Sequence, residues 1–244
     1  MAMRPVFIAA GRRVEERAVA FEWHAGMSVQ QRRKSIESLH CAAAAGGGGR
    51  LLEVSTKSPN SLGVCLSAMN LTLHPSGMPD MLVECAFQGS KVFAKGGPFV
   101  DLYSAVSRDA KRDARLTLSG PLVAFRFRGE DWPLEPKSAF YDWLYISALL
   151  QHRELAAHLA GYEAFTDIEF NPKKSLNTQA RSCALYVVLA NTGWLGEATA
   201  SKEGFLQALR KAYPAEEQYR EPGLFRTEHV RQSRGRVRGR RQSD

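Results

Sequence analysis

The sequence predicts an α+β fold in which strands and helices are intermixed along one domain. Short segments with alternating apolar residues recur between longer segments with apolar residues at helical spacing. No segment repeats another, which argues against a solenoid or a propeller. The 244 residues are enough to bury a sizeable core without staples. We therefore expect a single α+β domain over residues 1–195, a helical extension over 196–225, and a tail.

The first elements are expected to be two strands and a helix. Residues 5–10 are apolar, and residues 14–23 alternate large apolar side chains with smaller or charged ones, a pattern that favours strands. Ser28 should cap a helix over 28–45, because its hydroxyl can accept a hydrogen bond from an unpaired backbone N–H. The glycines at 46–49 should end this helix, since glycine loses much backbone entropy in a helix.

The next segments alternate between strand and helix patterns. Residues 51–56 favour a strand, and the Pro and Gly residues within 73–81 mark a loop. We expect a helix over 83–93, VECAFQGSKVF, which the following Gly-Gly-Pro should terminate. Residues 107–116, SRDAKRDARL, favour a short basic helix, and the alternation over 121–129 favours a strand.

The last part of the domain is mostly helical in pattern. Pro136 suits the first turn of a long helix over 136–151, and a second helix should follow over 153–160. Residues 165–170 favour a short strand, after which Asn-Pro turns the chain. An apolar helix is then expected to open at Ser175. The helical extension should be centred on the segment SKEGFLQALRKAY.

The net charge of +8 is concentrated at the C-terminal end. Residues 226–244 carry seven arginines and two acidic residues, a balance of +5 that leaves +3 for residues 1–225. This segment has no apolar pattern to fold on, so we expect a disordered basic tail that can pair with phosphates. A tail that only increases solubility is the alternative.

Cysteines and histidines give no pattern of a metal centre. The four cysteines form no Cys-x-x-Cys pair, and no histidine pairing suits zinc, so we expect free thiols and no metal. No run of about 18 apolar residues and no apolar N-terminal signal segment occurs, so we expect a cytoplasmic protein that does not contact a membrane. Gly-x-Ser-x-Gly and Walker patterns are absent, which argues against a serine hydrolase or a P-loop enzyme.

Four side chains would share one face of the helix over 83–93. The residues at i, i+3, i+4 and i+7 are Glu84, Phe87, Gln88 and Lys91. At this spacing an acid, an aromatic ring, an amide and an amine form one stripe. The stripe either points into a common functional space or is a solvated helix face with a distant Glu/Lys pair.

Polar side chains stand among apolar neighbours at three other places. These are Lys137 at the start of the long helix, Asp167 and Glu169 on the short strand, and Asn177 and Gln179 in the first turn of the apolar helix. A helix start offers unpaired backbone N–H groups, so the last place could hold an anion such as a pyrophosphate. The alternatives are a solvated lysine, the wet face of a strand and simple capping. Four aromatic residues are interpreted as core or rim residues, namely Trp132, Tyr141, Trp143 and Tyr145.

Together these segments resemble the NADAR family, also called YbiA-like. Residues 83–93 resemble the family helix in which Glu is followed by an aromatic residue, Gln and Lys at this spacing. Three further segments are similar to family motifs, namely SRDAKRDARL, WPLEPKSAFYDWLYISALLQHRELAAHL and TDIEFNPKKSLNTQARSCALYVVL. The resemblance covers roughly residues 50–192 and implies a single mixed NADAR-like domain.

A closer resemblance is to the NADAR antitoxins that are associated with DarT-type toxins. It rests on ESLHCAAA, STKSPNSLGVCLSAMNL, VECAFQGSKVF with the following GGPFVDLY, and FTDIEFNPKKSLNTQARS. This chain departs from ordinary YbiA-like members at one loop. Their Gly-rich, Trp-Gly-containing loop is replaced here by FNPKKSLN.

The resemblance implies an activity. DarT-type toxins are ADP-ribosyltransferases that act on DNA, and NADAR proteins are understood to remove ADP-ribose from guanine bases. The protein would therefore reverse its toxin's lesion without a cofactor. Its partners would be DNA with ADP-ribosylated guanine and, as a second candidate, the cognate toxin. The implied catalytic residues are Glu84, Lys137 and Asp167. The implied ADP-ribose contacts are Gln88, Lys91, Arg108, Lys111, Trp132, Asn177 and Gln179.

Several alternatives remain open. Glu84 can stabilise oxocarbenium character at the ribose while Asp167 orients the ribose or a water molecule. Instead, the Lys137 amine can add to the opened sugar's aldehyde as a Schiff base. Two other classes of function also fit: a nucleic-acid-binding module without hydrolase activity, and an antitoxin that only occludes its toxin.

Overall fold

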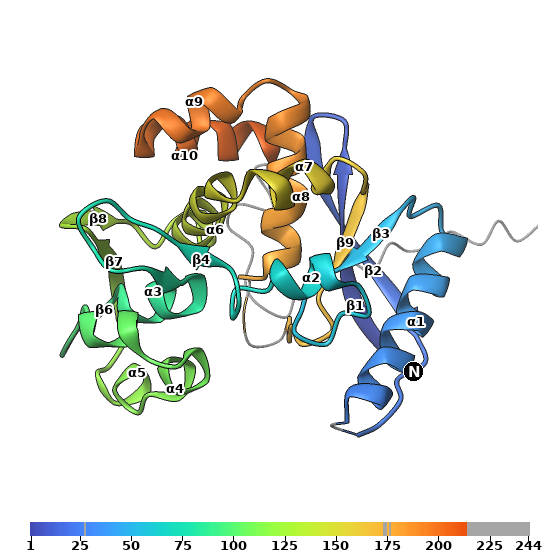
Figure 1. Ribbon diagram of the computed structural model, residues 1–244, viewed down its shortest axis with the longest axis horizontal. Coiled ribbons are helices and arrows are strands. Elements are labelled where there is room, and N and C mark those ends of the chain that lie inside the picture. Colours follow the sequence, from blue (N-terminus) through green and yellow to red (C-terminus); the bar gives the residue numbers. More distant parts are fainter. Residues whose placement is uncertain (27, 173–174, 176, 214–244) are drawn as a thin grey trace, which may run out of the picture.

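The largest sheet has four strands and lies on the right in Figure 1. The computed structural model describes residues 1–26, 28–172, 175 and 177–213. The strand order is β2-β1-β9-β3, in which β3 and β9 are parallel and the other neighbours antiparallel. These strands are β1 (Ala2–Ala10), β2 (Arg13–Phe21), β3 (Leu51–Glu53) and β9 (Ala164–Thr166).

Two smaller sheets lie on the other side of the molecule. The three-stranded sheet is antiparallel and consists of β6 (Lys91–Phe93), β7 (Leu122–Phe127) and β8 (Glu130–Trp132). A two-stranded sheet pairs β4 (Thr72–Leu73) with β5 (Met81–Leu82). The segment predicted as a loop over 73–81 therefore connects these two short strands.

Helices connect and cover the sheets. In the first half of the chain they are α1 (Val29–Ala45), α2 (Ser61–Cys65), α3 (Val83–Gly89), α4 (Ser107–Arg112) and α5 (Arg115–Leu118), together with the 3₁₀ helix η1 (Val100–Ser104). In the second half they are α6 (Ala139–Gln151), α7 (Arg153–Leu159), α8 (Gln179–Asn191), α9 (Leu195–Ala200) and α10 (Lys202–Ala212). The mixture of helices with parallel and antiparallel strands confirms the predicted α+β class.

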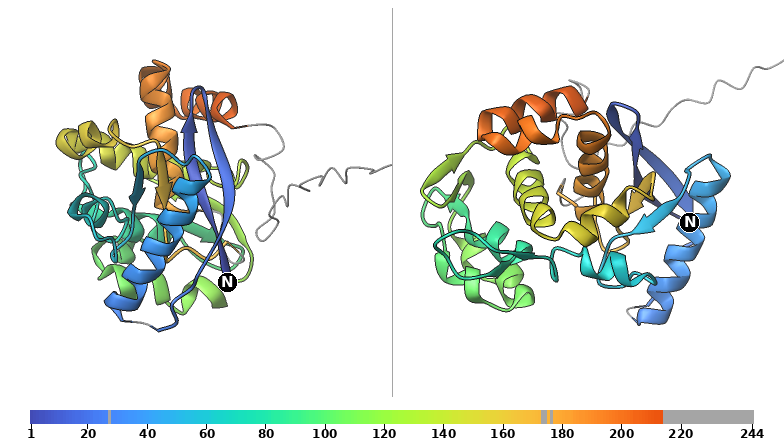
Figure 2. Two further views of the ribbon diagram at one scale, coloured as in Figure 1. Left: turned by 90° about the vertical axis from the view of Figure 1, so that its right-hand side faces the viewer. Right: turned by 45° about the horizontal axis from the view of Figure 1, so that its top comes forward.

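The main core lies around α6 and α8, which run between the two larger sheets (Figures 1 and 2). Tyr145 of α6 is fully buried, and its hydroxyl donates a hydrogen bond to the Leu66 carbonyl at 2.6 Å. α10 contributes Phe205 and Leu209 to the same cluster. The helices of the expected extension therefore pack on the same core as the rest of the chain.

α1 packs on the four-stranded sheet through a smaller hydrophobic cluster. Its cap is as predicted, because the Ser28 hydroxyl accepts a hydrogen bond from the Gln31 N–H at 3.3 Å and Gly46 follows the last helical residue. The buried members of this cluster are Val6, Phe21, Ile36, Leu39, Ala43, Ala164 and Ile168. This cluster fixes α1 beside the first two strands.

The helix predicted over 83–93 is shorter than expected. α3 ends at Gly89, and Lys91 is the first residue of β6, where it pairs with Phe125 of β7. Gly89 approaches the Tyr103 ring so closely that a Cβ would lie 2.6 Å from it. This packing and the pairing with β7 override the local helical pattern.

The basic helix predicted over 107–116 is divided into two. α4 ends at Arg112, and α5 begins at Arg115. Asp113 accounts for the break, because its Oδ1 accepts a hydrogen bond from the Arg115 backbone N–H at 2.8 Å. Such a local side-chain bond to the backbone competes with continuation of the helix.

Two helices begin later than predicted. The Ala139 N–H donates to the Pro136 carbonyl in a turn, so Pro136 precedes α6 instead of standing in its first turn. The helix expected to open at Ser175 begins at Gln179, because Thr178 is extended with φ −150°. Asn177 and Ser175 therefore precede α8.

The strand predicted over 165–170 ends at Thr166. Asp167 Oδ1 accepts hydrogen bonds from the backbone N–H groups of Glu169 and Phe170, at 3.0 and 3.1 Å, and so closes a turn. Asp167 is 8% exposed while Glu169 is exposed, so the two acids do not share the wet face of a strand.

Two predictions for the C-terminal end lie outside the described residues. These are the disordered tail over 226–244 and the part of the extension beyond residue 213. None of the helices in the described ranges has the length and apolar character needed to cross a membrane.

Candidate active site

α3 is buried along its whole length, and its polar side chains are joined in a row. Gln88 Nε2 donates a hydrogen bond to Glu84 Oε1 at 2.8 Å, and both residues are only 6% exposed. Lys91 Nζ then donates to Gln88 Oε1 at 2.7 Å. The alternative of a solvated helix face is therefore wrong for Glu84 and Gln88.

Two ammonium groups lie close to this row. Lys111 Nζ of α4 is 3.8 Å from Glu84 Oε1, and Lys91 Nζ is 4.8 Å from the centroid of the Phe87 ring. Burial lowers the pKa of Lys91 to about 8, although the negative charge of Glu84 opposes this change. Among the described residues, no group donates a hydrogen bond to the second carboxylate oxygen of Glu84. One oxygen of the acid is therefore held while the other remains available to a ligand.

A series of hydrogen bonds links α3 to the four-stranded sheet. The Glu84 backbone N–H donates to the Ala68 carbonyl at 2.9 Å, and the Ala68 N–H donates to Gln179 Oε1 at 3.0 Å. Gln179 Nε2 donates to the Val54 carbonyl at 2.7 Å, and the Val54 N–H donates to the Thr166 carbonyl. Gln179 thus holds two backbone segments with the two ends of its amide. A direct contact between Gln179 and ADP-ribose stays a prediction.

Asp167 holds the turn that follows β9. Besides its two backbone donors, Asp167 accepts a hydrogen bond at Oδ2 from the Thr178 hydroxyl at 2.8 Å. Burial raises the pKa of Asp167, and the nearby carboxylate of Glu53 raises it further. All three donors belong to the protein, so the observed contacts of this carboxylate stabilise the turn that follows β9 and join it to Thr178.

Glu53 is a second buried acid in the same region. Its Oε1 accepts a hydrogen bond from the Ile168 N–H at 2.8 Å, and its Oε2 accepts one from the Thr166 hydroxyl. His40 Nε2 lies 2.8 Å from that hydroxyl oxygen and must be its donor, because the hydroxyl proton is directed to Glu53. Burial raises the pKa of Glu53 and lowers that of His40 to about 4.

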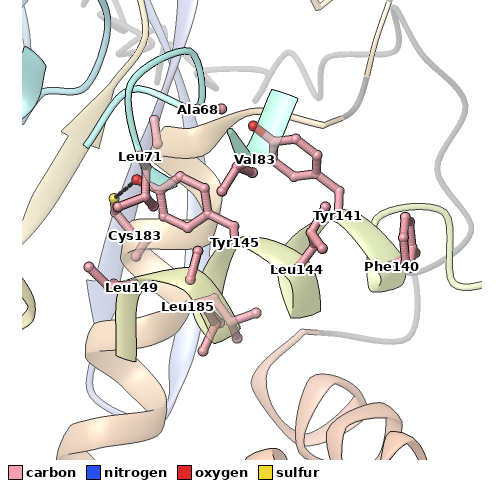
Figure 3. Packing of buried hydrophobic residues seen from close by; sticks show 14 of the residues in the cluster. Ala68, Leu71, Val83, Phe140, Tyr141, Leu144, Tyr145, Leu149, Cys183 and Leu185 are labelled. Atoms are coloured by element: carbon pink, nitrogen blue, oxygen red, sulfur yellow. Dashed lines mark hydrogen bonds between the residues drawn. The ribbon is translucent and has the colours of Figure 1, made fainter. Parts of the chain in front are cut away.

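Tyr141 of α6 connects the α3 side of the site with the Asp167 side. Its ring meets the Phe87 ring edge to face, with 5.0 Å between the centroids, and the residue is 5% exposed. In Figure 3 the Tyr141 side chain extends from α6 past Val83, with its hydroxyl directed toward Ala68. Burial raises the pKa of this hydroxyl well above its usual value, and the carboxylates of Glu84 and Asp167 raise it further. The hydroxyl therefore stays protonated beside both acids.

Three further predicted site residues lie around this centre. Lys137 is half-buried in the turn before α6, four residues before Tyr141. Arg108 is exposed on α4, the helix that also carries Lys111. Asn177 precedes α8, and its buried Oδ1 has no hydrogen-bond partner among the described residues. Their contacts with ADP-ribose stay predictions.

Trp132 lies in the hydrophobic core at the end of β8. It is 1% exposed, and its ring packs against Phe140, Trp143 and Phe205, with centroid separations of 5.7, 4.8 and 6.4 Å. The interpretation as a core aromatic is therefore confirmed. Contact between this ring and ADP-ribose would require the surrounding aromatic cluster to open.

Three residues of this region were not among the predicted site residues, namely Glu53, Tyr141 and Thr178. For Glu53 the sequence does contain a signal, because Glu53 is a charged residue within the apolar run LLEVST. A carboxylate that is buried with such a run requires hydrogen-bond donors, which indicates a polar site around it. The positions of Tyr141 and Thr178 depend on partners from distant segments and had no local signal.

The arrangement suits the stabilisation of a cationic sugar next to an anionic ligand. A buried carboxylate acts strongly on positive charge that develops nearby, and two ammonium groups at its side can bind phosphate oxygens. No group of three or more His, Cys, Asp or Glu side chains within the described ranges is placed to hold a metal ion.

The family comparison covers most of the chain. A model of the DarT1-associated NADAR antitoxin matches residues 2–219, and so extends beyond the resemblance over 50–192 to include β1, β2, α1 and the C-terminal helices. None of the curated proteins matches the chain. Because the family model spans far more than half of the 244 residues, the chain belongs to the family of DarT1-associated NADAR antitoxins.

Proposed function

We propose that this antitoxin hydrolyses the bond between ADP-ribose and guanine bases in DNA, and so reverses modification by a DarT-type toxin. The family membership supports the antitoxin role, and the resemblance of its motifs to NADAR proteins implies the reaction. The observation that carries the proposal is the buried Glu84 carboxylate, which is held at one oxygen by Gln88.

Glu84 would act on the ribose. Cleavage of the bond between the anomeric carbon and the guanine nitrogen builds oxocarbenium character, which a nearby carboxylate stabilises. The hydrogen bond from Gln88 orients the carboxylate before the substrate arrives, so little reorganisation is needed during the reaction. The protonated Tyr141 hydroxyl can donate a hydrogen bond next to this acid.

Lys91 and Lys111 would bind the diphosphate of ADP-ribose. Both ammonium groups lie beside the Glu84 and Gln88 row, and neither belongs to the segment FNPKKSLN that replaces the usual family loop. At this distance, the two ammonium groups would offset the negative charge of the Glu84 carboxylate and also that of the bound diphosphate. Arg108 and Asn177 would add contacts at the edges of the site.

ADP-ribose affinity should depend on pH through Lys91. Its pKa is about 8, so the ammonium is charged below that pH and loses its proton above it. A bound diphosphate favours the charged form, so affinity should be constant below pH 8 and fall by at most about tenfold per pH unit above it. Calorimetric titration with ADP-ribose across this range measures the effect.

The matched variant is Lys91→Arg, because a guanidinium stays charged throughout this range. Its affinity profile should be flat. A decline above pH 8 that persists unchanged in Lys91→Arg would mean that another group controls binding.

The activity itself is tested with a single-stranded oligonucleotide that carries one ADP-ribosylated guanine. The protein should release free ADP-ribose and restore guanine, also in the presence of EDTA, and a strand modified on thymine serves as the control. Release that disappears with EDTA would contradict the metal-free reaction. A stable complex with the toxin, without any release from guanine, would favour the occluding antitoxin instead.

A further inference from the structure

A cationic cluster lies at the N-terminal side of the four-stranded sheet. Arg4 of β1 and Arg32 of α1 both place their guanidinium groups over the ring of Trp23, at 5.3 and 4.8 Å from the centroid. Arg33 and Lys34, the next residues of α1, are exposed. We call Arg4, Trp23, Arg32, Arg33 and Lys34 the N-terminal cluster.

The N-terminal cluster has an excess of positive charge. Among the described residues, none of the ion pairs involves Arg4, Arg32, Arg33 or Lys34. Burial and the repulsion from Arg32 lower the pKa of Arg4, whose buried Nε has no acceptor within the described ranges. The Asp167 carboxylate offsets part of this repulsion at Arg4, but positive charge remains in excess and opposes folding, so an external anion would stabilise this arrangement.

The N-terminal cluster lies close to Asp167, one of the predicted site residues. β1 and β9 pair antiparallel through Phe7 and Phe165, so the residues before Phe7 on β1 approach those after β9. In agreement, the Asp167 carboxylate is near enough to raise the pKa of Arg4. Figure 1 shows β1, β2 and α1 together on the right, with β9 beside them.

We propose that the N-terminal cluster binds the phosphodiester backbone of the DNA strand beside the modified base. Trp23 would act as a positioning residue that holds Arg4 and Arg32 in place, because a guanidinium over an indole loses less freedom when it binds phosphate. This inference rests on the proposed function, since it assigns a surface to the same substrate.

A nucleic-acid strand fits the N-terminal cluster better than the diphosphate of ADP-ribose does. Four cationic side chains spread over β1 and the exposed side of α1 exceed what one diphosphate can contact, whereas successive phosphates of a strand can reach all of them. Lys91 and Lys111 already stand beside Glu84, where the ADP-ribose is proposed to lie.

The test measures binding of an unmodified fluorescent single-stranded oligonucleotide to the full-length chain at several salt concentrations. Arg32→Ala with Arg33→Ala should lower affinity by about tenfold at 0.1 M salt and reduce the slope of log affinity against log salt by about 1.4. The matched control is Arg13→Ala with Arg153→Ala, which removes the same charge from exposed positions at the other end of β2 and on α7.

Trp23 is tested separately. Trp23→Ala should weaken strand binding, and Trp23→Phe should restore most of it, because a phenyl ring still holds guanidinium groups. Thermal unfolding of each variant confirms that the fold is intact.

Two outcomes would overturn the proposal. Equal losses in the Arg32/Arg33 variant and in the control would mean that only net charge matters. Weakened ADP-ribose binding with unchanged strand binding would assign the N-terminal cluster to the diphosphate. Because the oligonucleotide is unmodified, its binding does not depend on hydrolysis. Both outcomes can therefore be interpreted even if the protein hydrolyses no ADP-ribosylated base.

Discussion

Glu84→Gln is expected to abolish turnover of ADP-ribosylated guanine while ADP-ribose binding remains largely intact. Glutamine keeps the size of glutamate and can still bond to Gln88, but it lacks the negative charge that an oxocarbenium-like transition state requires. Ground-state contacts survive and the preferential stabilisation of the transition state is lost. Loss of a positioned electrostatic group costs on the order of 100-fold or more in rate.

The comparison with Lys137→Ala separates the two mechanisms. If a Schiff base on Lys137 carries the reaction, Lys137→Ala should be the more damaging change, and a borohydride reductant should trap a covalent adduct. Glu154→Gln, which removes an exposed carboxylate from α7, is the matched control and should keep the normal rate. Single-turnover rates, ADP-ribose affinity and thermal stability are measured for each variant.

Asp167→Ala is expected to lower the free energy of unfolding by about 3 kcal/mol and to reduce turnover strongly. The change removes the acceptor of three hydrogen bonds, from Glu169, Phe170 and Thr178, and each donor left unsatisfied costs about 1 kcal/mol or more. The turn over residues 167–170 would then lose the contacts that hold it near the Tyr141 hydroxyl, on which the Asp167 carboxylate acts. Chemical denaturation and single-turnover assays measure the two effects.

Asp167→Asn distinguishes a structural role from a catalytic one. An asparagine Oδ1 can accept the two backbone N–H groups, and its Nδ2 can donate to the Thr178 hydroxyl. This variant should therefore keep most of its stability and its rate. A stable Asp167→Asn protein with a rate as low as that of Asp167→Ala would show that the charge of Asp167 orients the ribose or a water molecule directly.

The elements that could be predicted from the sequence are those determined by local patterns. Ser28 capped its helix and the glycines from Gly46 ended it, because both effects involve only neighbouring residues. The spacing of Glu84, Gln88 and Lys91 placed an acid, an amide and an amine together although the helix ends between Gln88 and Lys91. Lys91 still donates a hydrogen bond to Gln88 from the first position of β6, so the hydrogen-bonded row forms although the predicted helix was too long.

The remaining features depend on contacts between distant segments. Asp167 is buried because Thr178 and its own turn provide donors, and Gln179 is engaged because Ala68 and Val54 present backbone groups to it. No local pattern reports such long-range pairs. Trp132 is a different case: its burial confirms the interpretation as a core aromatic, while the ligand contact that the family resemblance implied for it stays a prediction.

The most direct test of the account is a single-turnover experiment with the protein in excess over a strand that carries ADP-ribosylated guanine. The wild-type protein should release ADP-ribose and restore guanine, whereas Glu84→Gln should bind the modified strand and leave the adduct in place. Absence of release by the wild-type protein, or release by Glu84→Gln at a near-normal rate, would contradict the assignment of Glu84 as the catalytic carboxylate of an ADP-ribosyl-guanine hydrolase.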